Sequence, residues 1–377
     1  MSIDKGIIQF ECVFLYASLL KNIEISSRMI RGVVLKRFIT DKAKPALNGK
    51  SILITGGTGS FGTALLKRLL SDYKPRRIAI YSRGEHQHMA MLDGLSDEEK
   101  RIVRSFIGDV RDADRLKMAM RNVDIVYHAA ALKQVPIAEY NPFECIGTNV
   151  IGAENVARAA IDADVKQVIA LSTDKACDPI NLYGASKLAS DKIFIASNSY
   201  SGQEGTRMSV VRYGNVVGSV GSVVPFFRKL ISEGATELPI TDKRMTRFWI
   251  TLDQAVDFVL STTAMMRGGE IFVPKIPSTR ITDLAEAIAP GMPYKFIGKR
   301  PGEKLHEVMI SEHVSHNVVD AGDRYIIEPE WVYWERKSFA SEGFKPVKDE
   351  FRYASDSNDE WLTPAELRAM IPADRRA

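Results

Sequence analysis

Cysteine is scarce in this sequence. The 377 residues contain three cysteines, Cys12, Cys145 and Cys177, which lie far apart along the chain. One of them must remain unpaired, so the sequence excludes a disulfide-stabilised scaffold and is typical of a reducing compartment. No cysteines and histidines are spaced as metal ligands, so we expect no bound metal, and we expect His86 and His88 to lie in solvent.

Long hydrophobic runs are also absent. The most apolar early stretch, residues 6–20, is interrupted by Gln9 and Glu11 and is too short to span a bilayer. It also lacks the basic start and the small-residue cleavage site of a secretory signal. We therefore expect a cytoplasmic protein with no integral membrane segment.

An excess of one charge is confined to the N-terminal end. The formal net charge is +4, and residues 1–48 carry eight Lys/Arg against four Asp/Glu, which leaves 43 of each sign elsewhere. A neutral body has no basic footprint for nucleic acid, so we expect no such partner. We assign residues 1–48 to an extension of unknown role, which could be a peripheral contact, an oligomer arm or a dispensable appendage.

From residue 49 onward, short apolar runs alternate with helix-length amphipathic segments. The runs are almost continuously hydrophobic, as is typical of parallel strands covered on both faces. They occupy residues 51–55, 77–81, 102–107, 123–127 and 168–171. This order predicts an α/β fold with a Rossmann-like doubly wound parallel sheet in residues 49–215. We expect residues 216–377 to form mainly a smaller C-terminal substrate-binding domain, with some segments returning to the first.

A glycine-rich turn separates the first predicted strand from a helical pattern. Glycines in such a turn let the backbone approach a pyrophosphate, and the following helix directs unpaired N–H groups at it. Glycine patterns also occur in tight structural turns, but the strand–turn–helix context favours dinucleotide binding. The predicted contacts are Gly56, Thr58, Gly59, Ser60, Phe61 and Gly62.

The end of the second predicted strand indicates which dinucleotide binds. An acid there holds the ribose hydroxyls and repels an additional phosphate, whereas Ser82 and Arg83 suit a ribose 2′-phosphate. We therefore expect NADP rather than NAD, although Arg83 could be only a solvated charge. Asp109 and Val110 are expected at the adenine. The acids here could alternatively cap the helix that begins near Asp112.

Tyr183 and Lys187 occupy positions i and i+4 of a predicted helix and so share one face. An ammonium group and an oxidised nicotinamide near a phenol lower its pKa from about 10 and make it a usable base. The spacing alone is weak evidence, but here it follows five predicted strands and a phosphate-binding turn. We therefore predict that this pair acts on a substrate beside the cofactor.

Several motifs together resemble the extended short-chain dehydrogenase/reductase family, which includes sugar-nucleotide epimerases and dehydratases. The matching segments are residues 55–62, His128-Ala129-Ala130-Ala131, Asn149, Ser172-Thr173, Tyr183, Lys187 and residues 212–216. The resemblance implies that Tyr183 takes the proton from the sugar 4-hydroxyl while hydride leaves C4 for the nicotinamide. It further implies a homo-oligomer, either a dimer or a hexamer. The implied cofactor contacts are Ala129, Ala130, Lys133, Asn149, Tyr183 and Lys187, with Lys133 also near the sugar and Thr173 both near the sugar and part of the catalytic set.

Asp174 and Lys175 bear on the chemistry after C4 oxidation. A 4-epimerase needs no further acid or base, whereas a 4,6-dehydratase needs a base at C5 and an acid at the 6-hydroxyl. Asp-Lys at these positions resembles the C5-inverting dehydratases of UDP-N-acetylglucosamine, and the resemblance continues through residues 131–136, 244–249 and 300–307. We expect Lys175 to remove the C5 proton and Asp174 to protonate the leaving hydroxyl. The alternative is a loop-capping Asp174 and a solvated Lys175.

The residues expected to hold the UDP-sugar come from the same resemblance. Asn215, Arg247 and Arg300 are expected at the diphosphate and Glu303 at the uridine ribose. Each arginine could instead form an ordinary surface ion pair. The product would serve a surface glycan such as one containing pseudaminic acid. Two rivals remain open: a UDP-sugar 4-epimerase and a non-catalytic NADP-binding regulatory protein.

Overall fold

The computed structural model of this protein describes residues 38, 40–218 and 222–371. One compact unit begins at Phe38. Most of the predicted N-terminal extension, residues 1–37, lies outside the described residues. Among the residues described, no helix is both long and apolar enough to cross a membrane.

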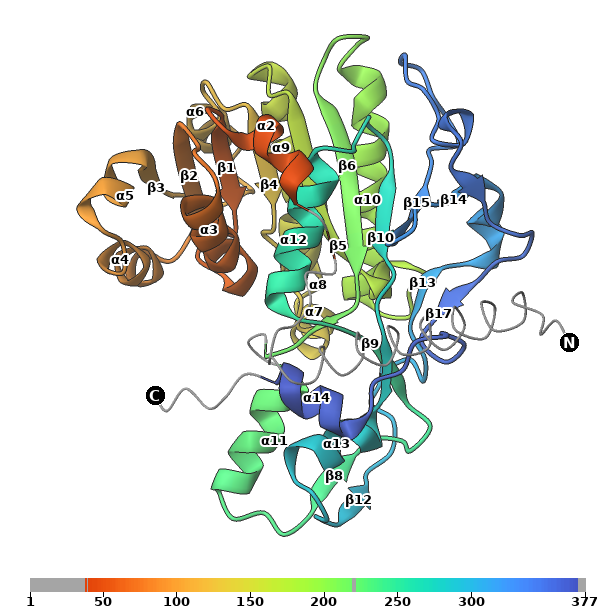
Figure 1. Ribbon diagram of the computed structural model, residues 1–377. Helices are drawn as coiled ribbons and strands as arrows, with labels where there is room; N and C mark the ends of the chain where they lie inside the picture. The colour runs from red at the N-terminus through yellow and green to blue at the C-terminus, as the bar shows by residue number, and fades with distance from the viewer. Residues whose placement is uncertain (1–37, 39, 219–221, 372–377) are drawn as a thin grey trace, which may run out of the picture. The chain divides into compact units, whose positions relative to one another are not determined.

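A ten-stranded sheet forms the centre of the compact unit (Figure 1). Its strands are β1 (Ser51–Thr55), β2 (Arg77–Ser82), β3 (Val103–Ile107), β4 (Ile125–His128), β5 (Gln167–Thr173), β6 (Arg207–Tyr213), β10 (Ile271–Pro274), β14 (Val318–Asp320), β15 (Arg324–Ile327) and β16 (Lys345–Pro346). They lie in the order β16-β14-β15-β10-β6-β5-β4-β1-β2-β3. Pairing is parallel from β10 to β3 and antiparallel among β10, β15, β14 and β16. The predicted doubly wound parallel sheet is confirmed.

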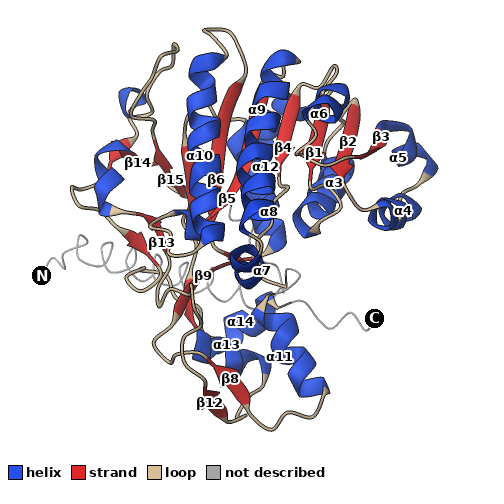
Figure 2. Cartoon of the chain, turned by 180° about the vertical axis from the view of Figure 1, so that it is seen from behind, coloured by secondary structure: helices blue, strands red, loops and turns tan. Residues whose placement is uncertain are grey.

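Helices cover both faces of the sheet. On one face α3 (Ser60–Asp72) packs beside α12 (Leu252–Thr263), and on the other α9 (Gly152–Asp162) packs between α6 (Ala113–Ala119) and α10 (Leu182–Tyr200) (Figures 1 and 2). This cover explains the continuous hydrophobic runs, since all five residues of β1 are buried. The other helices around the sheet are η1 (Asp41–Ala43), α2 (Lys44–Leu47), α4 (Glu85–Asp93), α5 (Asp97–Ile102), α7 (Val135–Tyr140), α8 (Pro142–Ile146), the π-helix η2 (Gly147–Ile151), η3 (Asp174–Ala176), η4 (Glu312–Asn317) and η5 (Ala340–Glu342).

The direction of the chain connections reverses between β1 and β4, which pair in the middle of the sheet. From β1 the chain moves outward through β2 and β3, whereas from β4 it moves the other way through β5 and β6. The loops that leave the carboxyl ends of β1 and β4 therefore diverge, and open α/β sheets bind their ligands in the crevice left at such a point.

A smaller lobe lies below the sheet in Figure 1. Its elements, with the short strands that join it to the sheet, are β7 (Asn215–Val216), α11 (Val223–Ser232), β8 (Leu238–Ile240), β9 (Thr246–Ile250), β11 (Ser278–Arg280), α13 (Ile281–Ile288), β12 (Tyr294–Phe296), β13 (Val308–Ile310), β17 (Tyr353–Ala354) and α14 (Pro364–Met370). It has apolar clusters of its own, one around Trp249 and Leu284 and one around Phe227. Since β10 and β14 to β16 belong to the main sheet, segments after residue 215 return to it. The division into two domains at residue 215 stays a prediction.

Residues just before the predicted boundary at position 48 pack into the main core. Phe38, Ala43 and Leu47 are fully buried. The Phe38 ring contacts that of Phe258 on α12, with the ring centroids 4.8 Å apart, and the Arg324 guanidinium lies 4.6 Å from the Phe258 ring centroid. This segment therefore helps to cover the α12 face of the sheet.

Candidate active site

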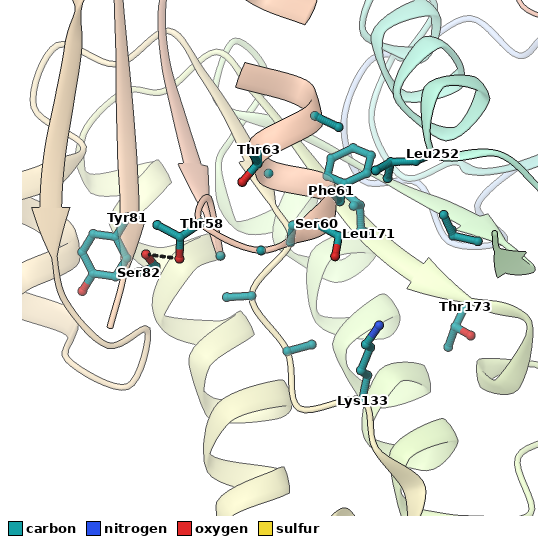
Figure 3. A pocket seen from close by; sticks show the side chains of 18 of the residues that line it. Thr58, Ser60, Phe61, Thr63, Tyr81, Ser82, Lys133, Leu171, Thr173 and Leu252 are labelled. Carbon is teal, nitrogen blue, oxygen red and sulfur yellow. Dashed lines mark hydrogen bonds between the residues drawn. The ribbon is translucent and has the colours of Figure 1, made fainter. Parts of the chain in front are cut away.

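A cavity of about 1580 Å³ opens along the carboxyl ends of the central strands (Figure 3). It is larger than a pocket for one small ligand, roughly 300–1,000 Å³. Its lining includes Gly56, Thr58, Gly59, Ser60, Phe61, Gly62, Ser82, Arg83, Asp109, Val110, Ala129, Ala130, Lys133, Thr173, Lys175, Tyr183 and Lys187. The Lys133 side chain reaches from its loop into this space (Figure 3). The fold thus brings most of the predicted site residues to one cavity.

The turn between β1 and α3 fits a pyrophosphate. Gly56 has a φ of 65°, and a Cβ atom there would lie 2.8 Å from the backbone nitrogen of Ala130. A Cβ atom at Gly62 would clash with Gly57, so the helix and the turn touch directly. Gly59 precedes α3 without any side-chain cap, which leaves the first N–H groups of this helix available to an anion.

The end of the cavity near β2 and β3 is charged. Arg83 Nη1 lies 3.8 Å from Asp109 Oδ2, and Arg111 donates to the same oxygen from its guanidinium at 2.7 Å. Burial acts to raise the pKa of Asp109, but the hydrogen bonds from Arg111 outweigh it and hold that pKa below its usual range. Asp112 caps α6 through a backbone N–H at 2.9 Å. The predicted capping alternative therefore applies to Asp112, and Asp109 lines the cavity.

His88 is buried, so the expectation that it lies in solvent is wrong. It is 2% exposed, and its ring nitrogens lie 2.8 Å from Ser82 Oγ and 2.6 Å from Ser105 Oγ. Ser82 Oγ in turn lies 2.9 Å from Thr58 Oγ1 in the glycine-rich turn (Figure 3). The apolar residues of α4 follow no clear helical stripe, so the sequence pattern did not indicate which side of this helix faces the sheet.

Tyr183 and Lys187 lie near the start of α10 and both line the cavity. Burial raises the pKa of Tyr183 to about 12, opposed most strongly by the charge of Lys175 and by a hydrogen bond with Thr173. The expected lowering of this pKa is therefore absent in the protein alone, and the lysine that opposes the rise most is Lys175. Burial also lowers the pKa of Lys187, which weakens that residue as a source of positive charge.

Asp174 and Lys175 form an ion pair beside Tyr183. Lys175 Nζ donates to Asp174 Oδ1 at 3.0 Å and lies 3.4 Å from Glu307 Oε1. Burial acts to lower the pKa of Lys175, but the two carboxylates outweigh it and hold that pKa above its usual range. The Lys175 side chain is 25% exposed and that of Asp174 is fully buried, so a solvated lysine is excluded. Thr173, rather than Asp174, caps this loop by accepting from the Lys175 N–H.

Glu307 completes this cluster and was not predicted as a site residue. Its side chain is 2% exposed, and the Oε1 atom that faces Lys175 lies 3.7 Å from Arg247 Nε. Its Oε2 atom has no hydrogen-bond partner among the described residues. The available sequence signal was its place at the end of the matched segment 300–307. The fold places Glu307 beside Lys175, which thereby has a second carboxylate neighbour.

The remaining predicted residues are not part of the cavity lining: Asp174, Asn149, Asn215, Arg247, Arg300 and Glu303. Asn149 is buried, accepts the Leu132 N–H at 2.8 Å and donates to Ser186 Oγ at 2.9 Å. Its amide therefore ties the loop after β4 to α10. Asn215 stands between two lining residues, Gly214 and Val216.

Of the three remaining residues predicted at the UDP moiety, Arg247 contacts the cluster, 3.7 Å from Glu307 Oε1. Arg247 donates to the Leu305 carbonyl at 3.1 Å, so it is fixed to the segment that carries Glu307. Arg300 is exposed, and its N–H donates to Glu303 Oε2 at 3.3 Å. The same segment docks near the start of α10, where Asn181 donates to the Gly302 carbonyl at 2.8 Å.

Comparison with known proteins identifies the family. The chain matches the family described as "Polysaccharide biosynthesis protein" over residues 52–329. The chain belongs to this polysaccharide biosynthesis protein family. Its resemblance to the extended short-chain dehydrogenases/reductases is thereby confirmed.

Two curated relatives of this chain have names with different activities. The UDP-N-acetylglucosamine 4,6-dehydratase (inverting) of Campylobacter jejuni subsp. jejuni serotype O:23/36 (strain 81-176) is 56% identical over 329 residues, 86% of this chain and 98% of that protein. The UDP-glucose 4-epimerase of Rickettsia akari (strain Hartford) is 44% identical over 331 residues, 85% of this chain and 95% of that protein. Among solved structures, Pen from Bacillus thuringiensis is 34% identical with a TM-score of 0.77 and covers 85% of this chain and 96% of its own.

The site is suited to proton transfer. Tyr183, Lys175 and Lys187 line a cavity whose glycine turn fits a pyrophosphate. The carboxylates of Asp174 and Glu307 lie next to Lys175. In the described part of the chain, no three His, Cys, Asp or Glu side chains are placed to hold a metal ion. Cys145 and Cys177 are buried free thiols.

Proposed function

We propose that this protein catalyses the C5-inverting 4,6-dehydration of UDP-N-acetylglucosamine to UDP-2-acetamido-2,6-dideoxy-β-L-arabino-hex-4-ulose, as a hydro-lyase that uses NADP. The cluster of Asp174, Lys175 and Glu307 beside Tyr183 carries the proposal. An epimerase returns hydride to C4 without a further acid or base, so it does not need the Asp174–Lys175 pair. The name of the 56% identical C. jejuni relative supports the same choice.

The first step removes a proton from the 4-hydroxyl and a hydride from C4. Tyr183 takes the proton, and Thr173 orients the phenol through their hydrogen bond. When bound, an oxidised nicotinamide supplies the hydride acceptor and a positive charge near the phenol. Because burial holds the pKa of Tyr183 at about 12 in the protein alone, the phenol needs such cations, and Lys175 already acts on it.

The second step eliminates water across C5 and C6. It requires a neutral Lys175 and a protonated Asp174, a state reached when one proton moves from the ammonium to the carboxylate along their 3.0 Å hydrogen bond. The amine then takes the C5 proton, the acid gives its proton to the leaving 6-hydroxyl, and the original ion pair is restored. Asp174 is fully buried, and its Oδ2 has no partner among the described residues, so this oxygen is not already occupied by another protein group.

The last step returns hydride to C6 and a proton to C5. Lys175 and Tyr183 both carry a proton at this stage, one from C5 and one from the 4-hydroxyl. Both are therefore candidates to reprotonate C5. Inversion requires that the proton arrives on the face opposite to the one that lost it, so Lys175 can deliver it only if the sugar ring turns over between the two steps, whereas Tyr183 can deliver it from the other side.

The residues at the end of β2 support NADP over NAD. Ser82 and Arg83 line the cavity there, and the next acid in the sequence is Glu85. The Arg83 side chain is 57% exposed and is faced by Asp109 at 3.8 Å, so its guanidinium can turn to a phosphate. A guanidinium and a hydroxyl bind an anionic phosphate through charge-assisted hydrogen bonds.

The UDP moiety is proposed to lie on the side of the smaller lobe. Arg247, Arg300 and Asn215 are proposed at the diphosphate, Glu303 at the uridine ribose and Lys133 near the sugar. Arg247 is held next to Glu307, 3.7 Å from its Oε1, so a diphosphate bound there would have its sugar near Lys175. The homo-oligomer and the surface-glycan product stay predictions.

The proposal predicts a specific product in deuterated water. UDP-N-acetylglucosamine incubated with the purified protein and no reductant should lose one water and gain one deuterium at C5, with the C5 configuration inverted. Mass spectrometry measures the first two changes, and proton NMR of the product measures the third. Incubation with heat-denatured protein is the control.

The rival functions predict different results in the same incubation. An unchanged mass with a new C4 epimer identifies a 4-epimerase. Binding of NADP⁺ without any conversion points either to another sugar nucleotide as the substrate or to the regulatory protein. Loss of water with retained C5 configuration contradicts the inverting assignment alone.

Glu307→Gln tests the electrostatic part of the proposal. Glu307 helps to raise the pKa of Lys175, so removal of its charge is expected to lower that pKa and make the neutral amine easier to form. The limb of the kcat/KM–pH profile that reflects Lys175 deprotonation should therefore move to lower pH. The control is Glu312→Gln, which changes an exposed acid and should leave this limb in place. A profile that does not move contradicts this role for Glu307.

A further inference from the structure

His88 is the buried residue of α4 and makes hydrogen bonds through both ring nitrogens. Nδ1 lies 2.6 Å from Ser105 Oγ on β3. Nε2 lies 2.8 Å from Ser82 Oγ and 3.2 Å from the Ser82 carbonyl oxygen on β2. None of the chemistry proposed above uses this imidazole, yet it holds a residue that lines the cofactor cavity.

The contacts fix which nitrogen carries the proton. Burial lowers the pKa of His88, so the ring is neutral and has one N–H donor and one acceptor. The Ser82 carbonyl oxygen can only accept, so the N–H belongs on Nε2. Nδ1 is then the acceptor, and the Ser105 hydroxyl donates to it.

This tautomer sets the direction of the hydroxyl groups beyond it. Ser82 Oγ accepts from His88 Nε2, so its own single proton must point away from the imidazole. It can be donated to Thr58 Oγ1, 2.9 Å away, or to a ligand in the cavity that both residues line (Figure 3). When Thr58 accepts this proton, its own O–H is free to donate into the cavity.

We infer that His88 is a positioning residue for cofactor choice, which presents Ser82 and Thr58 as hydrogen-bond donors to a ribose 2′-phosphate. A phosphate dianion only accepts hydrogen bonds, whereas a ribose 2′-hydroxyl both donates and accepts and gains less from a site of donors alone. Arg83 lines the same end of the cavity and supplies the charge. The inference rests on the proposed use of NADP and deepens it.

The test compares the affinities of NADP⁺ and NAD⁺ for the full-length protein by isothermal titration calorimetry. His88→Leu removes the donor and keeps an apolar side chain in the buried position. It is expected to weaken NADP⁺ binding roughly tenfold, as for loss of a hydrogen bond to a charged group, with much less effect on NAD⁺. His88→Gln, whose amide both donates and accepts, should restore part of the preference.

Ser105→Ala guards against a folding effect, because this serine is exposed. The substitution removes the hydroxyl that donates to His88 Nδ1, so the imidazole can also adopt the tautomer with its proton on Nδ1. We therefore expect a smaller loss of NADP⁺ preference than in His88→Leu, at an unchanged melting temperature. An unchanged NADP⁺/NAD⁺ ratio in both His88→Leu and Ser105→Ala overturns the inference and leaves the cofactor proposal intact. A wild-type protein that binds both dinucleotides equally overturns the cofactor proposal and the inference together. Whether or not the His88 and Ser105 variants change the ratio, Arg83→Gln should weaken NADP⁺ binding in a protein that prefers NADP⁺. This result would place the 2′-phosphate at Arg83.

Discussion

Tyr183→Phe is expected to lower kcat for dehydration by roughly 10³-fold, within the range typical for loss of a general base. The phenylalanine ring keeps the packing of the phenol in the cavity but cannot accept the 4-hydroxyl proton. NADP⁺ affinity should change little, since the glycine turn and the β2 end are untouched. Single-turnover formation of reduced cofactor measures the chemical step, and calorimetry measures the binding.

Tyr200→Phe is the matched control for this substitution. Tyr200 ends the same helix and is 77% exposed, so it loses the same hydroxyl outside the cavity and should keep full activity. The acid limb of the wild-type kcat/KM–pH profile, where Tyr183 must ionise, should disappear in Tyr183→Phe. Retention of C4 oxidation at the wild-type rate would show that another group takes the proton.

Lys175→Arg is expected to stop water elimination while C4 oxidation continues. Arginine keeps the positive charge between Asp174 and Glu307, but it does not release its proton in a protein and cannot take the C5 proton. A loss of roughly 10²–10⁴-fold in dehydration is expected. The measurement is deuterium at C5 of recovered sugar nucleotide, which should fall together with the dehydrated product.

Lys175→Met extends the test and needs a stability control. It leaves two carboxylates without their common cation, and breaking a buried pair in this way costs about 3–5 kcal/mol, so its melting temperature must be measured alongside. Lys192→Met, an exposed change on α10, should behave as wild type. If Lys175→Arg dehydrates at the wild-type rate, then Lys175 serves as a charge and the C5 base is a different residue.

The main sheet was predictable because its strands are buried on both faces. Residues 51–55 and 77–81, taken as continuous apolar runs, correspond to β1 and β2 with little change at their ends. The Tyr183–Lys187 pair was equally accessible, because both residues lie on one helix and helical spacing fixes which residues share a face. Local geometry therefore determined these features.

Glu307 and His88 could not be predicted in this way. Glu307 meets Lys175 only because the segment after β12 folds back against the start of α10, a contact that no local spacing encodes. His88 is buried through hydrogen bonds to Ser82 on β2 and Ser105 on β3 rather than as part of an apolar stripe. The high pKa of Tyr183 likewise depends on how deeply the assembled cavity buries the phenol.

The return of the chain to the main sheet has a consequence for how this protein is made. Strand β15 pairs with the outer edge of β10, and β14 and β16 continue the sheet beyond it. All three strands lie between residues 318 and 346. During synthesis from the N-terminus, the glycine turn and the first six strands leave the ribosome long before these residues exist. The β10 edge, with its unpaired backbone groups, therefore stays open to wrong partners until late in translation. The sheet that carries the nucleotide-binding turn is completed only by strands from the last quarter of the chain. We therefore expect the whole protein to finish folding only after that quarter has been synthesised.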